Sequence, residues 1–92
     1  MESQSASLVA TTVKVMLFAA AREQAGVDEM RLELGAGECT TTGAAQSLQQ
    51  RYPQLEKLLP RCALAVNGEY VQSEMALKEG DEVAVLPPMS GG

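Results

Sequence analysis

The sequence lacks histidine and tryptophan, and only two of its 92 residues are cysteines. Without histidine, Ser-His-Asp and Cys-His catalytic groups and most zinc sites are excluded. Cys39 and Cys62 do not have the spacing of a metal site, so we expect ordinary thiols in a reducing compartment. No apolar run approaches the roughly 20 residues that span a bilayer. The sequence therefore predicts neither a metal site nor a membrane protein.

Positive charge is also scarce. Seven Lys and Arg residues stand against twelve Asp and Glu residues, which gives a net charge of −5. Nucleic-acid binding needs clustered positive charge, so we expect no nucleic-acid partner. A single domain of this length leaves little room for an enclosed active site. We expect a carrier, an adaptor or a subunit rather than a complete enzyme.

The first segment, residues 1–12, is short and polar. It lacks the basic and apolar regions of a secretory signal, and it contains no Arg, which disfavours an organelle transit peptide. We expect these residues to form a disordered extension of a cytosolic protein. The folded domain is expected at residues 13–86, followed by an extended tail at residues 87–92.

The hydrophobic pattern predicts five strands and one main helix. Continuous or alternating apolar residues mark the strands, and apolar residues at helical spacing mark the helix. A short helical turn is expected at residues 19–26, and a second short helix should begin at Pro53 and end at Pro60. Asn67-Gly68 is a strong hairpin signal. The predicted strands are 13–19, 29–34, 63–66, 69–72 and 82–86, and the predicted main helix is 40–52.

The order of these elements predicts an α+β fold. The first and last strands are the most continuously apolar, which is typical of the centre of a sheet. A helix that crosses over one face would let these two strands lie side by side and parallel. This arrangement is the β-grasp, or ubiquitin-like, architecture, with a mixed sheet packed on one main helix. The residues expected to face the sheet from the helical segments are Ala45, Leu48, Tyr52 and Leu55.

The C-terminal tail is the segment that could carry chemistry. Pro87-Pro88 prevents further strand pairing, and the chain ends in Gly91-Gly92. Six residues reach roughly 20 Å when extended, and glycine passes through narrow channels because it has no Cβ. A terminal carboxylate that ATP activates as an acyl-adenylate can accept sulfur and become a thiocarboxylate. The alternative is a frayed polar tail without function.

Three segments resemble a known family, the small sulfur-carrying subunits of molybdopterin synthase. They are LFAAAREQAG (17–26), AVNGEYV (65–71) and LKEGDEVAVLPPMSGG (77–92). The resemblance implies that an activating enzyme of the ubiquitin-activating type uses ATP to adenylate Gly92, so that AMP is attached only transiently, and then helps to form the thiocarboxylate. The sulfur would convert a cyclic pyranopterin monophosphate precursor into the dithiolene of molybdopterin. No permanently bound cofactor is implied.

The resemblance also implies a large synthase subunit as partner, in a heterotetramer of two small and two large subunits. The catalytic side chains, including a lysine, would belong to the large subunit, so this chain would donate sulfur without being catalytic alone. Gly91, Ser90 and Met89 would insert into a pocket of that subunit. Leu86 and Phe18 are expected to share an apolar outer face beside the tail, as a partner interface. The alternative is that they are ordinary half-exposed sheet residues.

Several other polar residues have ordinary structural explanations. Arg22 and Glu23 are interpreted as a surface ion pair rather than a docking feature. Asp81 and Glu82 are expected to serve a turn and solubility rather than paired-carboxylate catalysis.

Three rival functions remain open. The chain could be a sulfur carrier of the same class for thiamine or tRNA thiolation. It could be a ubiquitin-like modifier that is joined to target lysines through Gly92. It could also be an adaptor domain without chemistry, in which case deleting Gly91-Gly92 would change nothing.

Overall fold

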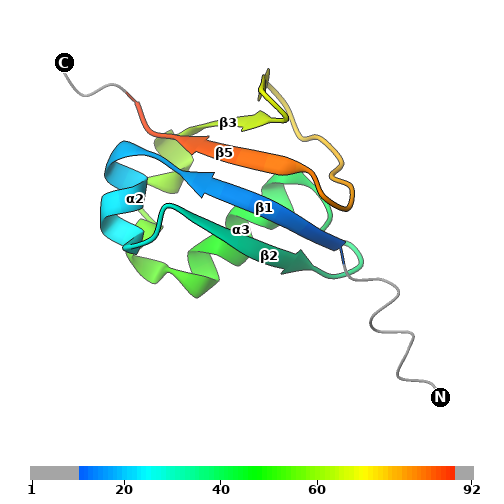
Figure 1. The fold of residues 1–92 in the computed structure, drawn as a ribbon, viewed down its shortest axis with the longest axis horizontal. Helices are drawn as coiled ribbons and strands as arrows, with labels where there is room; N and C mark the ends of the chain where they lie inside the picture. Colours follow the sequence, from blue (N-terminus) through cyan, green and yellow to red (C-terminus); the bar gives the residue numbers. More distant parts are fainter. Residues whose placement is uncertain (1–10, 89–92) are drawn as a thin grey trace.

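Five strands, two helices and two 3-10 turns make up the fold of residues 11–88, the part of the chain that this computed structural model describes (Figure 1). In chain order they are β1 (Thr11–Leu17), α2 (Ala19–Ala25), β2 (Glu29–Leu34), α3 (Thr41–Arg51), η1 (Pro53–Leu55), η2 (Leu59–Arg61), β3 (Ala63–Val66), β4 (Glu69–Val71) and β5 (Glu82–Leu86). The strands form one sheet in the order β2-β1-β5-β3-β4.

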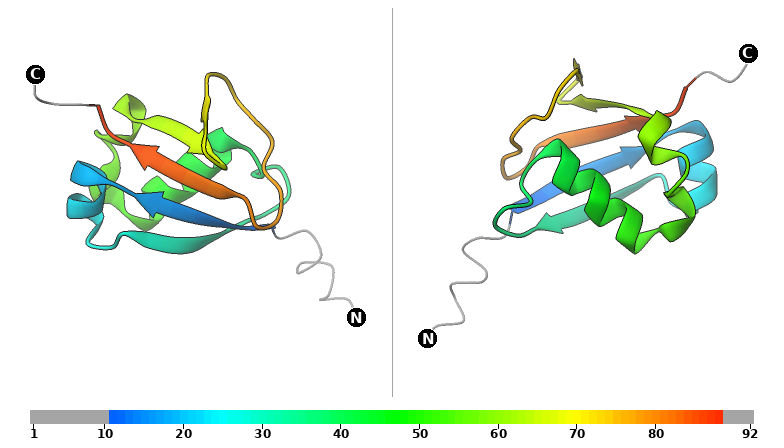
Figure 2. Two further views of the ribbon diagram at one scale, coloured as in Figure 1. Left: turned by 45° about the horizontal axis from the view of Figure 1, so that its top comes forward. Right: turned by 180° about the vertical axis from the view of Figure 1, so that it is seen from behind.

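The first and last strands are neighbours, as the sequence predicts. β1 and β5 run parallel, with Val15 opposite Val83, whereas β1–β2, β3–β4 and β3–β5 are antiparallel. Helix α3 crosses one face of this mixed sheet and leaves the other face uncovered (Figure 2). The α+β, β-grasp prediction is therefore confirmed.

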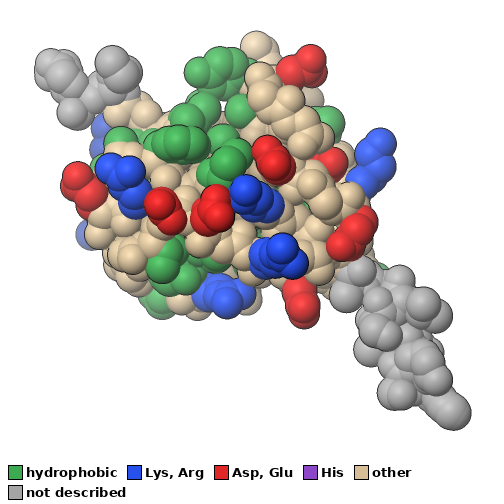
Figure 3. Space-filling model, in the orientation of Figure 1, with side chains coloured by type: hydrophobic (Ala, Val, Ile, Leu, Met, Phe, Trp, Pro, Cys, Tyr) green, Lys and Arg blue, Asp and Glu red, His purple; other side chains and the backbone are tan. Residues whose placement is uncertain are grey.

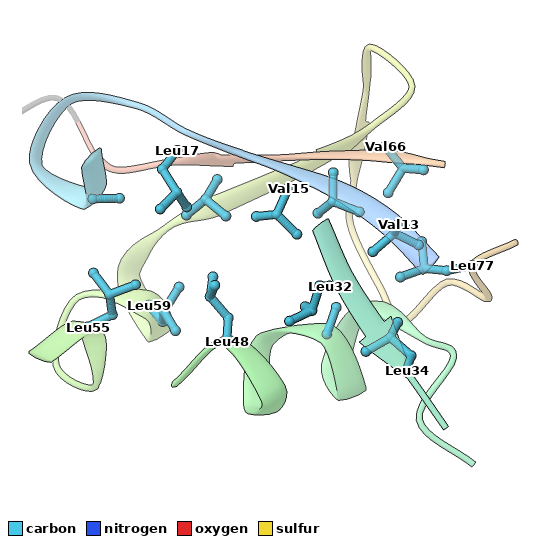
Figure 4. Close-up of a cluster of buried hydrophobic side chains, with 14 residues drawn as sticks. Val13, Val15, Leu17, Leu32, Leu34, Leu48, Leu55, Leu59, Val66 and Leu77 are labelled. Carbon is cyan, nitrogen blue, oxygen red and sulfur yellow. The ribbon is translucent and has the colours of Figure 1, made fainter. Parts of the chain in front are cut away.

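The core lies between α3 and the covered face of the sheet. Leu48 of α3 and Leu59 of η2 point toward Val15 and Leu17 of β1 (Figure 4). Fully burying one such side chain contributes about 1.5–3 kcal/mol. The sheet residues that are almost fully buried are Val13, Val15, Leu17, Leu32, Leu34, Val66, Val83 and Val85.

Thr40 determines where α3 begins. Its backbone is extended, and its Oγ1 accepts a hydrogen bond from the Gly43 amide at 3.0 Å. Ala44 and Leu48 are buried against the sheet. Ala45, which we expected to face the sheet, is partly buried and lines a small space with Leu48, Val15 and Val83.

Some element boundaries differ from the prediction. β1 begins at Thr11 and ends at Leu17, because the backbone of Ala19 turns to a positive φ of 51°. The expected second short helix is two separate 3-10 turns, and Pro60 lies within the second turn rather than ending it. Strand β4 ends at Val71, one residue before the predicted end.

The hairpin between β3 and β4 is confirmed. Asn67 and Gly68 have φ angles of 52° and 88°, the left-handed conformations that a type I′ turn requires. The turn sets Ala65 opposite Tyr70.

Candidate functional site

The tail leaves the domain from the end of β5, the middle strand of the sheet. Val83 and Val85 of β5 are 2% and 1% exposed, so they anchor this strand in the core. The strand ends at Leu86, as expected, because proline has no N–H to continue the ladder. Pro88 is exposed and is the last described residue. The predicted sulfur-bearing residue Gly92 and the predicted insertion residues Gly91, Ser90 and Met89 lie outside the described residues.

An apolar patch lies beside the origin of the tail, on the face of the sheet that α3 leaves uncovered. Strand register places these side chains together, since Met16 pairs with Ala84, Ala84 with Ala65, and Leu86 with Ala63. Figure 3 shows that hydrophobic side chains gather over β5 and β3 on this face. We call this surface the tail-side patch; its members are Met16, Phe18, Ala63, Ala65, Ala84 and Leu86.

Phe18 and Leu86 lie on the same face, as the strand alternation predicts. Leu17 and Val85 are paired and point into the core, so the residues that follow them point outward. Phe18 is 42% exposed and Leu86 is half-buried. Their role as a partner interface stays a prediction.

The contribution of β3 to the patch was not predicted from the sequence. Ala65 is on the uncovered face and is nevertheless only 7% exposed. The hairpin signal at Asn67-Gly68 fixes Ala65 opposite Tyr70, but it does not reveal that β3 pairs with β5. That pairing joins segments about twenty residues apart, and only the tertiary fold determines it.

Charged side chains lie on the uncovered face around the start of β1 and β5. Lys14 lies opposite Arg31 on one neighbouring strand and opposite Glu82 on the other, and its Nζ is 3.4 Å from Glu29 Oε1. Both members of that ion pair are largely exposed, so it adds little to stability. The face therefore changes from charged at the start of β1 and β5 to apolar at their ends, where the tail begins.

Asp81 fixes the start of β5. Its Oδ2 accepts from the Lys78 amide at 2.8 Å, and its Oδ1 accepts from Asn67 Nδ2 at 3.0 Å. These hydrogen bonds, that from the Lys78 amide first, lower the pKa of the Asp81 carboxyl. Asn67 Oδ1 in turn accepts from the Glu82 amide at 3.0 Å. The predicted turn role of Asp81 is confirmed.

Cys39 and Cys62 are free and half-buried, as expected of ordinary thiols. The Cys39 Sγ lies 3.3 Å from Thr11 Oγ1, and the Cys62 Sγ donates to the Leu58 carbonyl at 3.3 Å. Burial raises the pKa of the Cys62 thiol, although Arg61 acts in the opposite direction. A raised pKa disfavours the thiolate, so Cys62 is a poor nucleophile.

The predicted ion pair between Arg22 and Glu23 is not formed, which corrects the sequence interpretation. Both residues lie on α2, and consecutive helical side chains point in different directions. Both are exposed on a helix that contacts β5.

Neither a metal-ligand cluster nor a membrane-spanning helix is found among residues 11–88. No three potential metal-ligating side chains come together in this range, and none of its helices has the length and apolarity to cross a bilayer. The groove between α3 and strands β3 and β4, about 370 Å³ in volume, is open, and Glu74 is the one charged residue that lines it. The described domain thus presents an apolar patch beside the end of a buried strand, from which the chain continues to Pro88.

Comparison with known proteins identifies the family. The ThiS family matches residues 15–92. The molybdopterin synthase sulfur carrier subunit of Chlamydomonas reinhardtii is 48% identical over 82 residues, which cover 87% of this chain and 98% of the relative. The subunit of the same name from Arabidopsis thaliana is 39% identical over 80 residues, covering 87% of this chain and 82% of the relative.

A solved structure agrees with the fold. Small archaeal modifier protein 1 from Methanosarcina acetivorans superposes with a TM-score of 0.77 at 31% identity, covering 90% of this chain and 98% of that protein. The resemblance found in the sequence motifs is confirmed, and the chain belongs to the ThiS family, together with the molybdopterin synthase sulfur carrier subunits.

Proposed function

We propose that this chain is the sulfur carrier subunit of a molybdopterin synthase and that it acts in the cytosol. The observation that carries the proposal is the similarity to the Chlamydomonas reinhardtii carrier subunit along nearly the full length of both chains. The strand that leads to the C-terminus is anchored in the core by Val83 and Val85, which suits a domain that presents its chain end to other proteins.

The reactive atom is the carboxyl carbon of Gly92. In the first step a carboxylate oxygen attacks the α-phosphorus of ATP, and pyrophosphate leaves. In the second step hydrosulfide from the sulfur donor attacks the acyl carbon of the adenylate, the bond from that carbon to the phosphate oxygen breaks, and AMP leaves. The resulting thiocarboxylate is a soft nucleophile that needs no side chain. An activating enzyme of the ubiquitin-activating type supplies the catalytic groups for both steps.

The loaded carrier then docks on the large synthase subunit. The tail-side patch is the proposed contact, with Phe18 and Leu86 at its centre, because it is apolar and lies where the tail begins. Gly91, Ser90 and Met89 enter the partner's pocket. Two carriers would deliver the two sulfurs of the dithiolene to a cyclic pyranopterin monophosphate, within an assembly of two small and two large subunits.

The test is the intact mass of the protein after incubation with ATP, a sulfur donor and the activating enzyme. We expect a gain that matches one oxygen exchanged for sulfur, and no gain after deletion of Gly92. Persulfide formation on Cys39 or Cys62 would add a whole sulfur atom instead, so the two products differ in mass. A variant with both cysteines replaced by serine should load normally. An unchanged mass would overturn the carrier proposal.

A second candidate is a protein modifier, which the similarity to small archaeal modifier protein 1 supports. It predicts isopeptide conjugates between Gly92 and target lysines in the same incubation, when cell extract is added. A thiocarboxylate that is consumed when the large subunit and precursor are added favours the synthase subunit. A stable ladder of conjugates favours the modifier.

A further inference from the structure

Ala19 has an unusual backbone conformation for its residue type. Its φ of 51° lies in the left-handed region, which L residues other than Gly, Asn and Asp seldom adopt. Elsewhere in residues 11–88 this region is occupied by Asn67 and by four glycines, Gly26, Gly37, Gly68 and Gly80. Ala19 is therefore the one left-handed position of the described chain with a plain Cβ side chain, and its strain calls for an explanation.

The position of Ala19 relates it to the tail-side patch. β1 ends at Leu17, Phe18 continues with extended angles of −124° and 154°, and the chain turns sharply at Ala19 into α2. The Phe18 carbonyl accepts from the Ala21 amide at 3.0 Å, and Ala21 is fully buried. The turn thus brings Ala21 into the core, whereas Phe18 stays 42% exposed at the end of β1, directly after the Leu17–Val85 pair.

Hydrogen bonds also fix the segment that follows Ala19, from α2 to the start of β2. The Leu17 amide donates to the Asp28 carbonyl at 2.9 Å, and Gln54 Nε2 donates to the Gln24 carbonyl at 3.0 Å. Ala19 is the residue directly after Phe18 at which the backbone changes direction between β1 and α2. A glycine would make the same turn at no steric cost, but it would also open extended and mirror-image conformations. The Cβ of alanine removes those alternatives.

We propose that Ala19 is a positioning residue for partner docking, whose restricted left-handed backbone holds Phe18 in place on the tail-side patch before the partner arrives. Pre-organisation lowers the entropy that is lost when an interface side chain becomes fixed. This inference rests on the proposed function, because the partner is the large synthase subunit.

The experiment compares A19G with A20G, which adds a glycine one residue further along the same helix. We expect A19G to weaken binding of the large subunit roughly three- to tenfold while its melting temperature stays at or above that of the wild type. We expect A20G to lower the melting temperature without weakening binding. In the background of F18A, the A19G change should have no further effect on affinity.

Two results would overturn the inference: wild-type affinity of A19G, or an equal loss in the F18A background. A second measurement is independent of the partner. The ¹⁵N order parameter at the Phe18 amide of the isolated protein should fall in A19G and stay high in A20G. If the wild type fails to bind the large subunit, the proposed function fails and the docking role of Ala19 fails with it. The order parameter still decides whether Ala19 restricts the backbone at Phe18, and an unchanged value in A19G refutes that restriction.

Discussion

The side chains of Asn67 and Asp81 join two turns that are 14 residues apart, through a hydrogen bond of 3.0 Å from Asn67 Nδ2 to Asp81 Oδ1. Asn67 belongs to the β3–β4 hairpin, and Asp81 directly precedes β5. The backbone of the same two segments is also paired, since the Asn67 amide donates to the Glu82 carbonyl at 2.8 Å. The start of the strand that leads to the tail is thus fixed by the hairpin.

The D81N variant should destabilise the domain. In Asp81 each carboxylate oxygen accepts one hydrogen bond, from the Lys78 amide and from Asn67 Nδ2. In asparagine an NH₂ group replaces one of these oxygens, so the side chain can no longer accept both bonds. The bond that remains also loses the contribution of the negative charge. Losing such bonds costs about 1–3 kcal/mol. Urea unfolding at pH 7 measures the loss. The control E82Q changes an exposed neighbour, and a loss of equal size there would contradict the specific role of Asp81.

The same carboxylate predicts a pH dependence. The pKa of Asp81 is lower in the folded state than the usual value of about 4. The carboxylate therefore contributes its full stabilisation above the unfolded pKa and loses it as the pH falls through the folded pKa. The free energy of unfolding of the wild type should fall more steeply below about pH 4 than that of D81N. Parallel curves for the two proteins would refute this prediction.

Gly43 should not tolerate a side chain. A Cβ there would lie 2.8 Å from the Glu38 carbonyl carbon and even closer to its oxygen, and both are backbone atoms. We expect G43A to destabilise the domain by about 1–3 kcal/mol, although alanine favours helix, because overpacking outweighs propensity. The matched control is G35A, whose Cβ would meet its nearest neighbour, a flexible side-chain atom, at 3.8 Å. Thermal unfolding of both variants tests the prediction.

Changing Leu86 to serine should weaken docking without unfolding the domain. The side chain lies half-buried on the uncovered face, so its loss removes contact area from the proposed interface rather than from the core. An interface anchor of this kind is worth about 1–2 kcal/mol, or roughly five- to thirtyfold in affinity for the large subunit. Calorimetric titration measures it. Q50A, on the exposed side of α3, should bind as the wild type does.

A bulkier residue at Gly91 should obstruct sulfur loading. Glycine can enter a narrow channel, whereas the branched side chain of valine cannot. We expect G91V to show little or no oxygen-for-sulfur exchange by intact mass and an unchanged melting temperature, because the substitution is far along the chain from the core. S90A, a smaller change in the same tail, serves as control. Normal loading of G91V would argue against a tight channel in the activating enzyme.

The sequence predicted the fold well where local patterns decide it. The alternation in Glu29–Leu34 and the turn at Asn67-Gly68 are local, and both are confirmed. The close approach of Gly43 to the Glu38 backbone was missed, because the hydrophobic pattern does not show how the loop before α3 lies against the helix.

The candidate site was predicted in part. The alternation of side chains along a strand was enough to place Phe18 and Leu86 on one face. Whether β3 residues join the patch depends on the order of the strands in the sheet, which the alternation does not show. The left-handed Ala19 gives no signal in the sequence, because alanine ordinarily favours a right-handed helix.

The parallel pairing of β1 with β5 sends the chain into the sheet at one end and out at the other (Figure 1). Thr11 and Pro88 therefore lie on opposite sides of the domain. An affinity tag, a fluorophore or a sensor surface joined to the chain ahead of Thr11 would thus be attached on the side of the domain opposite to Pro88. The protein can therefore be immobilised or labelled through its N-terminus without covering the side of the domain on which Pro88 lies.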